Sequence, residues 1–118
     1  MEKSDARIVF MTAPSAGIAS DIVRTLVEEG VIACGNIVPG VTSIYEWQGA
    51  LEQTAEALVV MKTVVGRLEQ LEQRVNALHP YDVPELLAVA VSEGNPPYLA
   101  WLVGNASAGV QEERQDVP

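Results

Sequence analysis

The chain has little of several residue types on which common functional classes depend. Its 118 residues include one cysteine and one histidine, and 7 basic residues stand against 16 acidic ones. A single cysteine excludes a disulfide within the chain and a zinc site made of cysteines alone. The formal charge of −9 and the lack of basic clusters argue against nucleic acid as a partner, because phosphates must be neutralised by lysine and arginine.

Long apolar runs are also missing. No run approaches the roughly 20 apolar residues that a membrane-spanning helix needs, and residues 1–5 lack the apolar stretch of a signal peptide. We therefore expect a cytoplasmic protein without a membrane partner. The apolar fraction of 48% is enough for the core of one domain. We expect this domain at residues 1–104 and a flexible, acidic tail at residues 105–118.

The hydrophobic pattern predicts strands that alternate with amphipathic helices. Strands are expected at residues 8–12, 31–47, 51–63 and 86–91. Helices are expected between the first two strands, at residues 65–78, and from Pro96 until Gly104 stops the last one. Pro39-Gly40 suggests a bulge or bend, and Gln48-Gly49 a tight hairpin turn. This order is typical of an α+β, ferredoxin-like βαββαβ fold with an added C-terminal helix.

The second and third strands form an unusually long hairpin. About 15 residues at roughly 3.3 Å each would extend near 50 Å, whereas a domain of about 100 residues has a radius of gyration near 13 Å. The hairpin must bend at Pro39-Gly40 or project past the domain. Residues 57–61 are apolar on both faces, so this strand should be covered on both sides. A homo-oligomer that covers the projecting strands is the expected solution, and a bent hairpin in a monomer is the alternative.

The segment 79–85, which reads HPYDVPE, holds the only histidine between prolines and carboxylates. A proline disfavours helical geometry for the residue before it, so the preceding helix should end near His79. A histidine there can bind a metal, respond to pH, or interact favourably with the helix end as a cation.

A second group of residues suggests a ligand cleft. Glu56 and Lys62 fall on the same face of one strand, which predicts a shared polar cavity, although Lys62 can also reach water from the strand end. Apart from Phe10, the aromatic residues of the chain are Tyr45, Trp47, Tyr81, Tyr98 and Trp101. They either supply the walls of a small-molecule site together with these charges or pack a core. The residues expected at this cleft are Tyr45, Trp47, Glu56, Lys62, Tyr81 and Trp101.

Four motifs together resemble the CutA divalent-ion-tolerance family. They are the segment 33–49, Lys62-Thr63, the segment 79–85 and the segment 98–101, and the likeness extends from about Ile8 to Gly104. The resemblance implies a cytoplasmic homotrimer of ferredoxin-like subunits, related in architecture to the PII signal proteins. It also implies binding of copper or another divalent cation, with none obligatory, and it implies no catalytic activity.

The family's copper ligands are only partly present. The resemblance implies a cysteine in the first strand and two adjacent histidines, but here Met11 and Leu78 occupy two of these positions and only His79 matches. Met11 offers a thioether to Cu(I) or simply fills the core. We expect a metal site at His79, with Asp82, Glu85 and Met11 as further candidate ligands. The alternative is a PII-like trimeric module that binds or signals with a small ligand between subunits. We do not expect an enzyme, because His79 has no nucleophile within its own segment.

Overall fold

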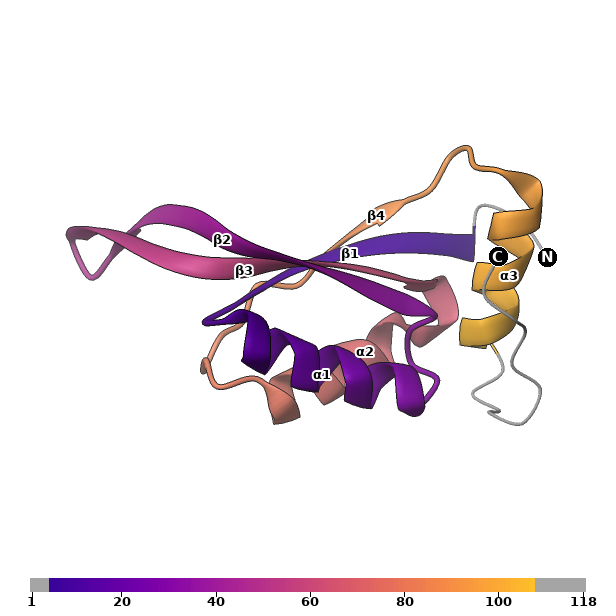
Figure 1. The fold of residues 1–118 in the computed structure, drawn as a ribbon, viewed down its shortest axis with the longest axis horizontal. Helices are drawn as coiled ribbons and strands as arrows, with labels where there is room; N and C mark the ends of the chain where they lie inside the picture. The colour runs from indigo at the N-terminus through magenta and orange to yellow at the C-terminus, as the bar shows by residue number, and fades with distance from the viewer. Residues whose placement is uncertain (1–4, 108–118) are drawn as a thin grey trace.

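A four-stranded antiparallel sheet organises the chain. The computed structural model describes residues 5–107, and the strand order β2-β3-β1-β4 is that of the predicted ferredoxin-like fold (Figure 1). The strands are β1 (Ala6–Ala13), β2 (Cys34–Trp47), β3 (Ala50–Val64) and β4 (Leu87–Ala90). The helices are α1 (Ala16–Glu28), α2 (Leu68–Leu78) and α3 (Pro96–Ser107), and a 3-10 turn, η2 (Val65–Arg67), precedes α2. Within residues 5–107, no helix is both long and apolar enough to cross a membrane.

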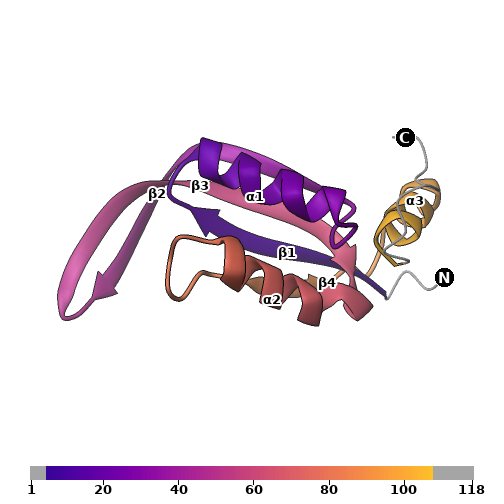
Figure 2. The same ribbon diagram turned by 90° about the horizontal axis from the view of Figure 1, so that it is seen from below.

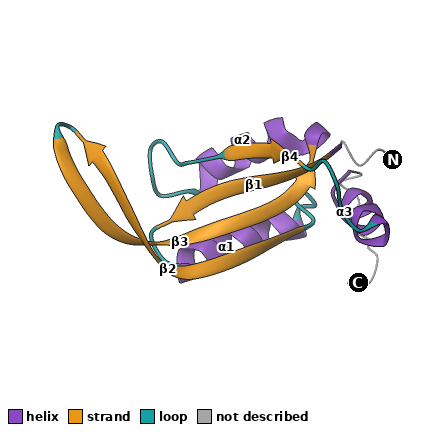
Figure 3. Ribbon diagram, turned by 90° about the horizontal axis from the view of Figure 1, so that it is seen from above, coloured by secondary structure: helices purple, strands orange, loops and turns teal. Residues whose placement is uncertain are grey.

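Helices α1 and α2 cover one face of the sheet. They lie in front of the strands in Figure 2 and behind them in Figure 3. The Ser15 hydroxyl accepts the Ile18 N–H at 3.2 Å and starts α1, and Gly30 follows the helix with a φ of 75°. Alternate residues of the strands, such as Val9 and Val59, are buried beneath the helices. The core therefore lies between this face of the sheet and the two helices.

The β2–β3 hairpin is the longest element. Its far end lies beyond α1 and α2 in Figure 1, and the longest extent of the molecule is 46 Å. A register shift between Val38 and Val41 forms the bulge, where Gly40 has a φ of 72°. The turn has positive φ at Gln48 and Gly49, as expected of the turn that suits the twist of a hairpin. The predicted bulge and turn are confirmed.

The other face of the sheet is apolar and mostly uncovered. Phe10 pairs with Val60 on one side and with Leu87 on the other, and these side chains point away from α1 and α2. Helix α3 packs on one end of this face, against Ala6 and Val64. Leu87 is 62% exposed. The second apolar face predicted for β3 exists, but within residues 5–107 only α3 covers part of it.

The end of α3 differs from the prediction. Gly104 does not stop the helix, which continues to Ser107 and buries Asn105 and Ala106. The Asn105 side chain donates to the Trp101 carbonyl at 2.9 Å, and Arg67 Nε donates to the Ala106 carbonyl at 2.7 Å. These contacts favour one more helical turn despite the glycine. The first residues of the expected tail are thus helical, and the rest of it, 108–118, lies outside the described residues.

Candidate functional site

His79 is fixed by two hydrogen bonds at the end of α2. The backbone becomes extended at His79, one residue before Pro80, as the sequence predicts. The ring is 7% exposed; Nε2 lies 2.7 Å from the Thr12 carbonyl, and Nδ1 accepts the Tyr81 N–H at 3.1 Å. Because a carbonyl can only accept, Nε2 is the donor of this hydrogen bond. Both ring nitrogens are therefore engaged within the protein.

Tyr81 connects this segment to the long hairpin. Its ring lies 4.7 Å from that of His79, and its hydroxyl donates to Glu56 Oε2 at 2.5 Å. Burial, the bond to Glu56 and the nearby carboxylate charge raise the pKa of Tyr81 to about 12, because each disfavours the phenolate. The segment after α2 and β3 are thus joined by a charge-assisted hydrogen bond.

A pocket of about 670 Å³ opens beside this bond, between the hairpin and the segment after α2. Its lining comes from β2 and β3 and from residues 81–85, together with Thr12 of β1. The lining residues are Thr12, Ser43, Ile44, Tyr45, Trp47, Glu56, Tyr81, Asp82, Val83 and Glu85. The pocket, which we call the hairpin pocket, combines three aromatic rings and three carboxylates with no lysine or arginine.

The structure brings some of the expected site residues together and separates others. Of the expected cleft residues, Tyr45, Trp47, Glu56 and Tyr81 line the hairpin pocket. Trp101 does not, because it is 8% exposed and packs in the core beneath α3. Lys62, the last of the expected cleft residues, does not line the pocket either. The same is true of Met11, which was expected as a metal ligand.

Lys62 does not share a cavity with Glu56. Its ammonium group donates to Asn36 Oδ1 on β2. In the strand pairing Lys62 lies opposite Cys34 of β2. Cys34 is half-buried rather than fully buried, and its sulfur lies 3.6 Å from the Tyr98 hydroxyl. Burial, followed by the contact with Cys34, raises the pKa of Tyr98 to about 12. These groups form a separate polar patch beside α3.

The candidate metal ligands divide in the same way. Asp82 and Glu85 line the hairpin pocket, whereas Met11 is fully buried among core residues under α1 and α2. No three histidine, cysteine or carboxylate side chains in residues 5–107 are grouped so that they could hold a metal ion. One chain on its own therefore supplies an incomplete set of metal ligands.

Comparison with known proteins identifies the family. The family model described as CutA1 divalent ion tolerance protein matches residues 7–105. The chain belongs to the CutA1 family. The resemblance predicted from the four motifs is thereby confirmed.

Relatives of similar length carry names that refer to divalent cations. The chain is 49% identical over 98 residues to the divalent-cation tolerance protein CutA of Thermus thermophilus, covering 83% of this chain and 95% of the relative. It is 40% identical to the protein of that name from Escherichia coli, over 85% of this chain and 88% of the relative. The chain spans about half the length of the human CutA, of which it covers 52%. The names of the two bacterial relatives describe tolerance of divalent cations, and none of the three names states a catalysed reaction.

Solved CutA structures have the same fold. The Thermus thermophilus protein superposes with a TM-score of 0.84 at 48% identity, covering 86% of this chain and 98% of the other. CutA from Xylella fastidiosa gives a TM-score of 0.85 at 41% identity, covering 87% and 99%. The α+β architecture of this CutA1 family member is therefore shared with experimentally determined relatives.

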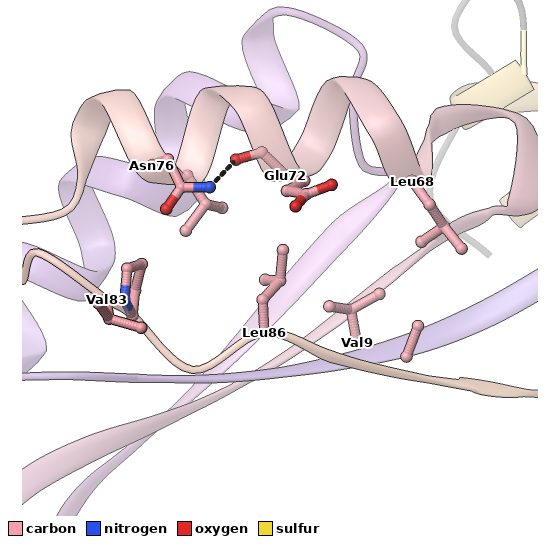
Figure 4. A pocket seen from close by; sticks show the side chains of 9 residues that line it. Val9, Leu68, Glu72, Asn76, Val83 and Leu86 are labelled. Carbon is pink, nitrogen blue, oxygen red and sulfur yellow. Dashed lines mark hydrogen bonds between the residues drawn. The ribbon is translucent and has the colours of Figure 1, made fainter.

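A second, smaller hollow of about 410 Å³ lies between α2 and the chain leading into β4 (Figure 4). Leu68 and Glu72 of α2 face Val9 and Leu86 across it, and the Asn76 amide donates to the Glu72 carbonyl at 2.9 Å. Sequence reasoning did not single out these residues. The apolar ones among them were marked only by hydrophobic periodicity, which also marks ordinary core positions, and Glu72 and Asn76 carried no signal.

Proposed function

We propose that this protein binds a divalent cation and thereby contributes to metal-ion tolerance, with copper the first cation to test. The match of the CutA1 family model to residues 7–105 carries this proposal. The names of the relatives do not favour the PII-like signalling alternative. The cytoplasmic location stays a prediction.

The proposed ligands are His79, Asp82 and Glu85, with different copies of the chain each contributing some of them, because no three such side chains within residues 5–107 of one chain are grouped to hold an ion. Imidazole suits copper, and carboxylates are common ligands of divalent cations. Asp82 and Glu85 are exposed, and no hydrogen bond or ion pair of their side chains is found within residues 5–107. His79 could offer Nδ1 only by releasing the Tyr81 N–H, so this ligand binds at the expense of one hydrogen bond. We therefore expect modest affinity, with the ligand set completed by water or by a second copy of the chain.

Calorimetric titration of the metal-free protein with Cu(II), Zn(II) and Ni(II) tests this proposal. We expect saturable copper binding that weakens about tenfold or more in His79→Ala and in the double variant Asp82→Asn/Glu85→Gln. Asp21→Asn removes an exposed carboxylate from α1 and should leave binding unchanged. Absent binding, or equal binding by all variants, would overturn the proposed function.

We further propose that the protein forms a homotrimer through the uncovered face of the sheet. Phe10, Val60 and Leu87 lie side by side on this face; Phe10 and Val60 are half-buried and Leu87 is exposed. A contiguous apolar face that stays partly open to water marks an interaction surface. A second copy would cover the apolar side chains that α3 leaves open.

Light scattering after size exclusion measures the oligomeric state directly. We expect three times the chain mass of 12.6 kDa for the natural sequence. Val60→Lys should lower the mass, because it places a charge at the centre of the face. Val65→Lys changes an exposed valine on η2, away from this face, and should leave the measured mass unchanged. A monomeric natural protein at micromolar concentration would contradict the trimer.

A further inference from the structure

The hairpin pocket is much larger than a site for a single ion. Its volume is about 670 Å³, and its three carboxylates are divided between two walls, with Glu56 on β3 and Asp82 and Glu85 on the opposite segment. They are not grouped closely enough to hold one metal ion. We propose that this pocket binds an organic cation with two amino groups, of the α,ω-diaminoalkane class. The proposal does not require the protein to bind a metal.

The aromatic side chains of the hairpin supply the first part of the argument. Tyr45 and Trp47 line the pocket, yet they are 43% and 60% exposed. The face of an aromatic ring carries negative charge density, so it attracts an ammonium group as well as the alkyl chain attached to it. Neither residue is part of the core clusters in residues 5–107. In the single chain their rings are therefore open to a ligand.

The position of the carboxylates supplies the second part. Glu56 is half-buried and uses one oxygen to accept the Tyr81 hydroxyl, which leaves the other oxygen for a ligand. Asp82 and Glu85 lie across the pocket and have no side-chain partner within residues 5–107. Separate carboxylates on two walls match two ammonium groups joined by a chain.

Other classes of ligand fit less well. An anion would meet three carboxylates and no lysine or arginine. A neutral apolar ligand would remove the carboxylates from water without pairing them, which is unfavourable. A dication with an alkyl spacer pairs the carboxylates and covers the rings at once.

Calorimetric titration of the whole protein with 1,4-diaminobutane tests the proposal. We expect saturable binding that weakens about tenfold in Trp47→Ala. The indole ring of the natural protein attracts an ammonium group and packs on the alkyl chain, and the variant loses both contacts. Leu51→Ala is the matched control, since Leu51 lies on the same hairpin, is 79% exposed and does not line the pocket. The uncharged analogue 1,4-butanediol should not bind. Equal binding of the diol, no saturable binding of the diamine, or equal loss in both variants would overturn the proposal.

Titration of the same samples with Cu(II) separates this proposal from the metal function. Trp47 has no metal-ligating atom, so Trp47→Ala should weaken diamine binding and leave copper binding unchanged. Copper binding without diamine binding would refute only the present inference. Diamine binding without metal binding would refute only the proposed function.

Discussion

The Tyr81 hydroxyl donates to Glu56 Oε2 at 2.5 Å and joins the segment after α2 to the long hairpin. The two residues are 25 positions apart in the sequence and lie on different walls of the hairpin pocket. On the other side of Tyr81, its backbone N–H donates to His79. One tyrosine thus connects the only histidine of the chain to the hairpin.

Loss of this hydroxyl should destabilise the protein moderately. In Tyr81→Phe the Glu56 carboxylate loses its donor, and we expect the free energy of unfolding to fall by roughly 0.5–1.5 kcal/mol, since the site is partly open to water. Denaturant titration measures the change. Tyr45→Phe is the control, because its hydroxyl makes no hydrogen bond within residues 5–107. If the two variants are equally stable, the bond contributes nothing that water does not replace.

Alkaline pH should weaken the fold through Tyr81 and Tyr98. Folding raises the pKa of each from 10.0 to about 12. Because the folded pKa is the higher one, this stabilisation is fully present below pH 10 and is lost as the pH rises through 12. Unfolding by denaturant at pH values from about 9 to about 12 measures the loss. The double variant Tyr81→Phe/Tyr98→Phe should show a shallower decline, and a parallel decline would contradict the assignment.

The sequence predicted the order of the elements because α1 and α2 have a clear hydrophobic period and the strands are runs rich in apolar and β-branched residues. Odd and even positions of β3 were correctly separated into two faces, but a shared face does not mean a shared pocket. Glu56 and Lys62 are six residues apart, which is about 20 Å along an extended strand. Lys62 therefore binds Asn36 while Glu56 binds Tyr81. The distance along the strand, and not the face of the strand on which a residue lies, decided which candidate residues came together.

Other misses concern tertiary contacts that no local pattern reports. Trp101 carries an aromatic motif, but its position on α3 places it in the core. Gly104 is a typical helix stop, yet the burial of Ala106 continues the helix. The predicted helix end at His79 was correct, but its two hydrogen bonds could not be predicted, because Thr12 is 67 positions away.

The bulge in β2 gives a prediction about backbone strain. At Gly40, with a φ of 72°, an added Cβ would meet no atom within 4 Å, so any cost of Gly40→Ala comes from the backbone alone. We expect the free energy of unfolding to fall by about 1–2 kcal/mol. Gly66 also has open space but no positive φ, so Gly66→Ala should stabilise by about 0.4–1 kcal/mol. Thermal unfolding of the pair checks this, and equal shifts would show that the bulge tolerates a side chain.

His79 should matter for stability as well as for any metal. In His79→Ala the Thr12 carbonyl and the Tyr81 N–H both lose their partner, and a largely buried ring leaves a cavity. We expect the free energy of unfolding to fall by roughly 2–3 kcal/mol in the absence of metal. Asn76→Ala is the control, because Asn76 is exposed on the same helix and bonds only within it. Denaturant titration of both metal-free variants decides the point. Equal stability of His79→Ala and the natural protein would mean that water replaces both bonds, so that the imidazole could be released to a cation without cost.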